Sequence, residues 1–143
     1  MDIFNSLRIS SSALQAQRMR LDTISSNLAN METTRTPEGG PYQKKSVVFR
    51  PVGTSFEERL DRSLRGAVQG VRVDRILADT SEPKMVYDPA HPDAEDSGYV
   101  AMPNINLMDE MVDMKSASRA YEANVTVVKA SKRMALKALE IGR

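Results

Sequence analysis

The residues that could bind a metal ion gather around the single histidine, His91, in the stretch "DPAHPDAED". Asp88, Asp93, Glu95 and Asp96 lie close to it in sequence, so a metal or Ca²⁺ loop is one interpretation. The spacing lacks the EF-hand pattern, however, and neither a second histidine nor a cysteine is available as a ligand. The favoured interpretation is a proline-stiffened turn with solvated carboxylates, and no metal or cofactor is expected.

The sequence also lacks the residue patterns of an active site. It has no Gly-rich phosphate loop, because "EGGPY" has the composition of a turn, and it has no nucleophile–base arrangement. Cysteine is absent, which excludes disulfides and thiolate chemistry. The sequence therefore predicts a protein that is not an enzyme and has no catalytic residues.

The net charge and the hydropathy of the sequence argue against nucleic acids and membranes as partners. The net charge of the 143 residues is +1, with both signs spread along the chain, which argues against nucleic-acid binding. No apolar run approaches the roughly 20 residues that span a bilayer, so direct membrane insertion is not expected. The stretch "MDIFNSLRISSSALQAQRMR" is amphipathic, without a basic n-region, and is not predicted to be a Sec signal.

Proline and glycine divide the chain into three parts. All seven prolines lie between Pro37 and Pro103, and six of the seven glycines lie between Gly39 and Gly98. Because both residue types break helices, we expect a mainly α protein with long terminal helices around a small β-rich, turn-rich middle. The predicted parts are residues 1–30, 31–103 and 104–143.

The first predicted helix begins near Asp2 or Asn5 and ends near Asn30. Its leucines recur every seven residues, and a half-polar companion row lies beside them. Such spacing is typical of a coiled-coil seam. The leucines are Leu7, Leu14, Leu21 and Leu28, and the companion row is Ile3, Ser10, Gln17, Ile24 and Met31.

The last predicted helix spans about 106–141 and carries two adjoining stripes, which indicates contact with more than one neighbouring helix. Its methionines could instead line a promiscuous binding groove, although packing is favoured at this spacing. The first stripe is Leu107, Met111, Met114, Ser118, Tyr121, Val125, Val128, Lys132, Ala135 and Leu139. The second is Ala117, Ala120, Asn124, Val127, Ser131, Met134, Ala138 and Ile141.

The middle part contains four strand-like runs, "SVVF", "GVRVDRIL", "PKMVY" and "GYVAM". The stretch "TSFEERLDRSLRGA" predicts either a short helix or a loop. We expect a small β-rich element here and not a large core.

The two predicted helices can pair as an antiparallel coiled-coil hairpin. Four leucines contribute roughly 6–12 kcal/mol at most, whereas ordering the first helix costs about 39 kcal/mol, so the first helix is not expected to be stable alone. In the hairpin the second stripe of the last helix stays exposed, and its expected partner is another chain. An alternative with the same pattern is a coiled-coil adaptor that binds an unrelated partner in a closed small oligomer.

Several motifs resemble those of the flagellar axial proteins, the family of rod, hook and hook-associated proteins. "LRISSSALQAQRMRLDTISSNLAN" is similar to their N-terminal segment, and "GPYQKKSVVF" is similar to the rod group. From "VYDPAHPDAEDSGYVAMPN" through "SRAYEAN" to the end, the chain resembles a proximal rod subunit. The resemblance covers both ends and much of the middle.

The resemblance implies a structural subunit of the flagellar basal-body rod, a drive shaft that crosses the periplasm and encloses an export channel. It implies export through the flagellar type III apparatus, and assembly with copies of the chain and with other rod proteins. "SSNLAN" and "SRAYEAN" would then be assembly motifs. The predicted interface comprises Leu7, Leu14, Leu21, Ile24, Asn27, Leu28, Asn30, Met111, Met114, Ala120, Tyr121, Asn124, Val125, Val128, Met134 and Leu139.

Overall fold

Two long helices and two small β-hairpins make up the described part of the protein, residues 3–52 and 69–141 of a computed structural model. Helix α1 spans Ile3–Ala29 and helix α3 spans Leu107–Ile141. At 1.5 Å per residue these helices are roughly 40 and 52 Å long. The prediction of a mainly helical chain with long helices near both ends is confirmed.

Local signals explain where the helices end. Asn106 caps α3, because its Oδ1 accepts a hydrogen bond from the backbone N–H of Met108 at 3.0 Å. The side chain of Asn30 closes α1 by donating from Nδ2 to the carbonyl of Ser26 at 2.8 Å. Both asparagines stand at the ends that the sequence predicted.

The four strands form two separate antiparallel pairs, and each strand overlaps one of the predicted runs, with β1 and β2 extending beyond theirs. Strand β1 (Lys45–Pro51) pairs with β2 (Val71–Ala78), with an irregularity between Val48 and Phe49. Strand β3 (Lys84–Tyr87) pairs with β4 (Tyr99–Met102). The predicted helix or loop in "TSFEERLDRSLRGA" lies outside the described residues.

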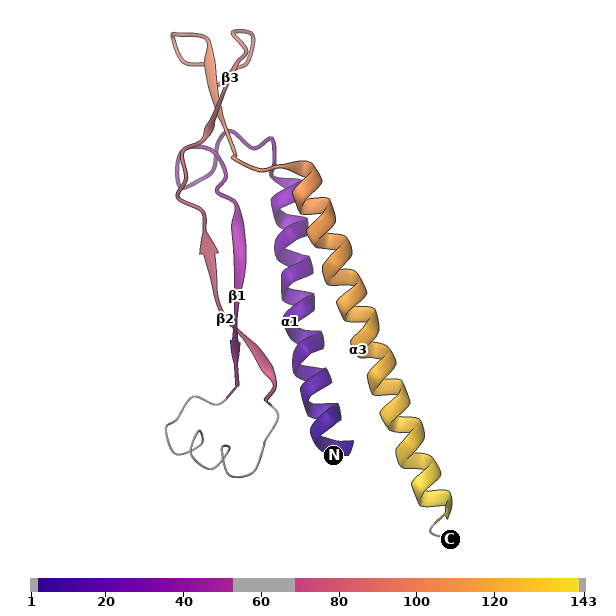
Figure 1. Ribbon diagram of the computed structural model, residues 1–143. Helices are drawn as coiled ribbons and strands as arrows, with labels where there is room; N and C mark the ends of the chain where they lie inside the picture. The colour runs from indigo at the N-terminus through magenta and orange to yellow at the C-terminus, as the bar shows by residue number, and fades with distance from the viewer. Residues whose placement is uncertain (1–2, 53–68, 142–143) are drawn as a thin grey trace.

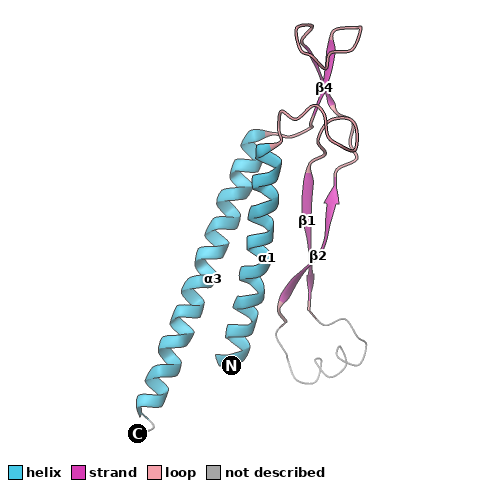
Figure 2. Ribbon diagram, turned by 180° about the vertical axis from the view of Figure 1, so that it is seen from behind, coloured by secondary structure: helices cyan, strands magenta, loops and turns pink. Residues whose placement is uncertain are grey.

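The helices lie side by side and run in opposite directions (Figure 1). The β1–β2 hairpin lies along α1 on the side away from α3, as both ribbon views show, and the β3–β4 hairpin extends beyond the end of the helix pair (Figure 2). Helix α1 is therefore the central element, in contact with α3 and with the first hairpin.

Few apolar side chains are buried in this arrangement. In the described part of the chain they are Ala16, Ile24, Val100, Pro103 and Ala117. Buried polar side chains are as numerous: Ser10, Thr23, Asn27, Glu110 and Ser131. The helix pair is consequently held by small side chains and hydrogen bonds more than by a large apolar core.

The sequence predicted that one complete stripe of α3 would pack on α1. The structure shows a different packed face. The inward row combines members of both predicted stripes and lies between them. Ala117 and Ser131 are buried, and Met114, Asn124 and Val128 are half-buried. The row was obscured in the sequence because Glu110, Asn124 and Ser131 are polar, so hydrophobicity alone does not mark it.

Candidate assembly interface

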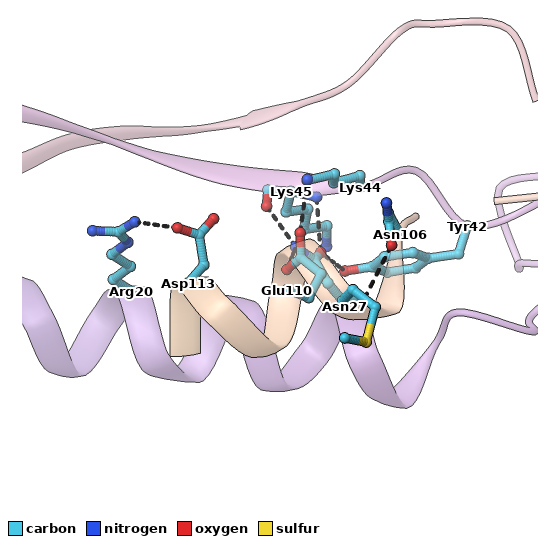
Figure 3. Close-up of polar contacts among 9 residues, drawn as sticks. Arg20, Asn27, Tyr42, Lys44, Lys45, Asn106, Glu110 and Asp113 are labelled. Atoms are coloured by element: carbon cyan, nitrogen blue, oxygen red, sulfur yellow. Dashed lines mark hydrogen bonds and ion pairs between the residues drawn. The ribbon is translucent and has the colours of Figure 1, made fainter. Parts of the chain in front are cut away.

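Asn27 connects three segments at the end of the helix pair where α1 ends and α3 begins (Figure 3). It is 1% exposed, and its amide makes four hydrogen bonds. Nδ2 donates to the carbonyl of Lys45 at 2.8 Å and to Oε2 of Glu110 at 3.0 Å. Oδ1 accepts from the backbone N–H of Lys45 at 2.9 Å and from the hydroxyl of Tyr42 at 3.2 Å. The full hydrogen-bonding capacity of this amide is used.

Glu110 provides the charge at this junction. Its side chain is 2% exposed, and Oε1 lies 2.7 Å from Nζ of Lys44. The hydrogen bond from Lys44 to Glu110 raises the pKa of Lys44 above its ordinary 10.5, although partial burial of Lys44 opposes the increase. Because the folded-state pKa is the higher one, the contribution of this pair to stability is present below pH 10.5 and is lost as the pH rises through the raised value.

A second ion pair links the helices one turn along α3. Nη2 of Arg20 lies 2.8 Å from Oδ1 of Asp113, with the two side chains 31% and 48% exposed. Solvent screens such a pair, so its contribution to stability is small, at most about 1 kcal/mol. Together with the buried Asn27–Glu110 contact, the Arg20–Asp113 ion pair fixes the register of the two helices.

Ser12 of α1 holds the end of the β1–β2 hairpin that lies opposite Asn27. The Ser12 hydroxyl donates to the carbonyl of Ile9 at 2.7 Å and accepts from the backbone N–H of Val71 at 3.1 Å. A methyl group at Gly70 would lie 2.7 Å from Ser12 Oγ, so any other residue at this position would displace the Ser12 hydroxyl. Asn27 and Ser12 together hold both ends of the hairpin against α1.

The structure places the predicted interface residues of α1 on or beside its packed side. Ile24 and Asn27 are buried, and Asn30 is half-buried. The heptad leucines are half-buried: Leu7, Leu14, Leu21 and Leu28. Each leucine therefore keeps apolar surface that a neighbouring chain could cover.

The predicted interface residues of α3 divide into two groups. The half-buried group comprises Met114, Ala120, Asn124, Val125 and Val128. The exposed group comprises Met111, Tyr121, Met134 and Leu139, at 53%, 36%, 56% and 70% exposure. Met111 and Met134 lie on opposite sides of the inward row, and Leu139 lies near the C-terminal end of α3, which continues past the start of α1 (Figure 1).

The sequence did not identify the partners of Asn27. Glu110, Lys44 and Tyr42 carry no spacing that connects them, because they approach Asn27 only in the folded chain. A weak signal was available: a carboxylate in the first turn of α3, next to the Asn106 cap, where the helix dipole favours negative charge.

The loop around His91 forms a turn through its own side chains. Oδ1 of Asp88 accepts from the backbone N–H of Ala90 at 3.1 Å, and Nδ1 of His91 accepts from that of Asp93 at 3.1 Å. Across residues 3–52 and 69–141, no group of three or more His, Asp or Glu side chains is placed to hold a metal ion. Within the same residues, neither helix is apolar enough over a sufficient length to cross a membrane.

Comparisons with known proteins match both helices to flagellar rod proteins. The family profile described as "Flagella basal body rod protein" matches residues 7–35, and that described as "Flagellar basal body rod FlgEFG protein C-terminal" matches residues 96–141. These ranges include most of α1 and α3, so the helix pair is of the class found in flagellar basal-body rod proteins.

Full-length relatives make the assignment specific. "Flagellar basal-body rod protein FlgC" of Bacillus subtilis is 49% identical over 100% of both chains. The protein of the same name from Borreliella burgdorferi is 49% identical over 99% of this chain and 98% of its own, and that of Salmonella typhimurium is 40% identical over 100% of both. The chain belongs to the FlgC family of flagellar basal-body rod proteins, which are structural proteins and not enzymes.

Proposed function

We propose that this chain is a subunit of the proximal rod that assembles through α1 and α3, as a coiled-coil helix pair, with copies of itself and with other rod proteins. The observation that carries the proposal is the mismatch between long helices and little buried apolar surface. The helix pair buries three apolar side chains, Ala16, Ile24 and Ala117, whereas Met111, Met134 and Leu139 stay exposed on α3. Contact with adjoining helices would remove these side chains from water.

In the assembled rod the helix pairs would transmit motor torque and surround the export channel, on the periplasmic side of the inner membrane. A chain with so small an apolar core is suited to passage through the flagellar type III export apparatus, because little burial has to be undone before transport. Export through this apparatus would not use a Sec signal.

A pair of charge substitutions in α1 tests the proposal. In a flagellated strain lacking its own copy of the gene, Leu21→Asp places a carboxylate at a half-buried seam position, at a cost of several kcal/mol. Gln15→Asp introduces the same charge at an exposed position of the same helix. Leu21→Asp should be synthesised but should not support swimming, and Gln15→Asp should support it.

Electron microscopy of basal bodies purified from the two strains provides the structural readout. Rods should be missing with Leu21→Asp and should contain the chain, with α1 and α3 packed on adjoining subunits, with Gln15→Asp. Normal swimming and normal rods with Leu21→Asp would show that the α1 seam is not an assembly interface.

A further inference from the structure

The β3–β4 hairpin carries an apolar face that the chain leaves uncovered. Cross-strand partners of an antiparallel pair share a face, so Met85 and Ala101 lie beside the pair Tyr87 and Tyr99. Met85, Tyr87 and Tyr99 are 47%, 65% and 43% exposed, whereas Val100 on the opposite face is completely buried. The chain itself therefore covers the hairpin at Val100, and the face with the two tyrosines is open to solvent.

The hairpin stands apart from the two helices. In the part of the chain that the structure describes, β3 and β4 pack on no other helix or strand. Figure 1 shows the hairpin projecting beyond the end of the helix pair where α1 ends and α3 begins. A partner of the hairpin can therefore bind a chain whose helices are already packed on neighbouring helices.

The two tyrosine rings are held in a fixed arrangement before any partner binds. Their centroids lie 5.3 Å apart with an interplanar angle of 65°, which is an edge-to-face contact. Gly98 has a φ of 77°, and a methyl group there would lie 2.9 Å from Cε2 of Tyr87, so glycine leaves the space that the ring occupies. The backbone N–H of Glu95 donates to the carbonyl of Tyr99 at 2.9 Å, which closes the loop beside the rings. Such a preformed surface loses little side-chain freedom on binding.

Acidic side chains are concentrated in the hairpin and in the segments that lead into it. Residues 79–104 contain six carboxylates and one lysine, a net charge of −5 with His91 neutral, although the whole chain has a net charge of +1. Within residues 3–52 and 69–141, none of these carboxylates forms an ion pair. They are Asp79, Glu82, Asp88, Asp93, Glu95 and Asp96, and the last three are exposed in the loop that joins β3 to β4. The apolar face therefore has a negative rim.

The negative rim and the tyrosines define the chemistry of a partner. The rim attracts lysine and arginine, and it repels the anionic headgroups of a lipid bilayer. Arginine is especially suited, because its guanidinium group pairs with carboxylates and stacks on aromatic rings. A second copy of the chain offers a group of exposed cations on α3, at Lys129, Lys132 and Arg133. The proposed function already assigns that helix to contacts between helices, so the hairpin requires a different partner.

We propose that the β3–β4 hairpin is a docking surface for a basal-body protein other than this chain, one that presents arginine or lysine side chains around an apolar patch. The apolar patch would cover Met85, Tyr87 and Tyr99, and the cations would face the carboxylates of the loop. The proposal rests on the proposed function, since it takes the helices to be engaged within the rod and gives the hairpin a separate partner. Because charges form the rim of the contact, binding would weaken as the ionic strength rises.

A photo-reactive side chain tests the proposal in the assembled structure. Benzoylphenylalanine replaces Tyr87 in the gene-deleted strain, and a second variant carries it in place of Met85 on the same face, in case one substitution disturbs folding. The matched control carries benzoylphenylalanine in place of Lys84, which is exposed on the opposite face of the same strand. Cells are irradiated before the basal bodies are purified, and the cross-linked peptides are identified by mass spectrometry.

Both face positions should cross-link to a lysine- or arginine-containing peptide of another basal-body protein, with a yield about fivefold above that of the control. Neutralising the loop with Asp93→Asn, Glu95→Gln and Asp96→Asn should lower this yield roughly fivefold. Cross-linking mainly to a second copy of the chain or to lipid, a partner peptide without cations, or a yield that does not respond to the loop charge would overturn the proposal. So would the absence of cross-links at both face positions in strains that swim, although swimming would leave the proposed function standing.

Discussion

At the scale of single residues, a few polar side chains determine how the described elements meet. Asn27 reaches α3 through Glu110 and the start of β1 through Lys45, contacts separated by 83 and 18 residues in sequence. Because all four of its hydrogen-bonding groups have partners, loss of one partner leaves a buried group unpaired, which costs more than the bond itself contributes.

Substitution of Glu110 tests the importance of this junction. Glu110→Ala leaves the Lys44 ammonium without its partner and Asn27 Nδ2 with one bond, so the free energy of unfolding should fall by about 1–3 kcal/mol. Glu110→Gln keeps a carbonyl oxygen for Asn27 and should cost less. Urea denaturation of the purified chain at neutral pH measures both losses, with Glu122→Gln at an exposed position of α3 as the control.

The pH dependence separates charge from hydrogen bonding. The pKa of Lys44 is raised in the folded chain, so the stability difference between the wild type and Glu110→Gln should shrink as the pH rises above 10.5. No loss of stability with Gln at any pH, together with a loss with Ala, would show that the side chain acts only by filling space.

The residue scale is also where prediction from sequence was least complete. Asn27 was assigned to the interface through its motif and through the ability of asparagine to specify helix register. The partners of Asn27 were not predicted. Glu110 and Lys44 come from distant segments, and no local sequence pattern indicates that they form a buried pair. Tertiary proximity, and not residue type, distinguishes Glu110 from the neighbouring Asp109, which is exposed.

At the scale of elements, local sequence signals were sufficient to predict which helices and strands form. The concentration of proline and glycine in the middle of the chain predicted both helices, and four short strand-like runs predicted the strands. The inward face of α3 was not predictable by hydrophobicity, since Ala117 and Ser131 are small and Asn124 is polar. Small side chains are nevertheless favourable there, because they allow α1 and α3 to approach closely.

The attachment of the β1–β2 hairpin to α1 can be tested through Gly70 and Ser12. Gly70→Ala places a methyl group 2.7 Å from Ser12 Oγ, which must rotate and give up its bond to Val71, so a loss of about 1–3 kcal/mol is expected. Ser12→Ala removes the same bond and should cost about 1 kcal/mol. The double variant should cost less than the sum of the two, because the hydroxyl that clashes is gone.

A double-mutant cycle by urea denaturation measures this coupling. Val52→Ala is the control, since the methyl at Gly70 would lie 3.8 Å from Val52 Cγ2, an ordinary contact distance. Strict additivity of Gly70→Ala and Ser12→Ala would contradict the close approach between the hairpin and α1.

At the scale of the whole molecule, the interactions are distributed unevenly along the helix pair. The buried Asn27–Glu110 contact and the Arg20–Asp113 pair lie near the junction, whereas the opposite end of α3 carries exposed Met134, Leu136 and Leu139. Stability should therefore decrease from the junction toward the termini. Local opening requires little free energy where few contacts hold an element.

Hydrogen exchange on the dilute monomer tests this gradient. Amides of residues 23–29 and 110–117 should exchange most slowly, and those of residues 3–10 and 130–141 should exchange fast. The helix ends should become protected in assembled rods, because adjoining chains then cover them. Uniform slow exchange along both helices of the monomer would show that the isolated pair is stable throughout its length and does not depend on neighbours.

The amide of Asn27 also makes the hydrogen bonds that a third β-strand would make at the start of β1. At Lys45, the first residue of β1, it occupies both the backbone N–H and the carbonyl that a further strand would otherwise pair with. Unpaired strand edges are templates for aggregation. A two-stranded sheet with exposed Ile76 and Leu77 is vulnerable to such pairing. By closing the edge where β1 begins, one helix side chain helps to keep the chain from forming unintended β-sheet contacts with other chains.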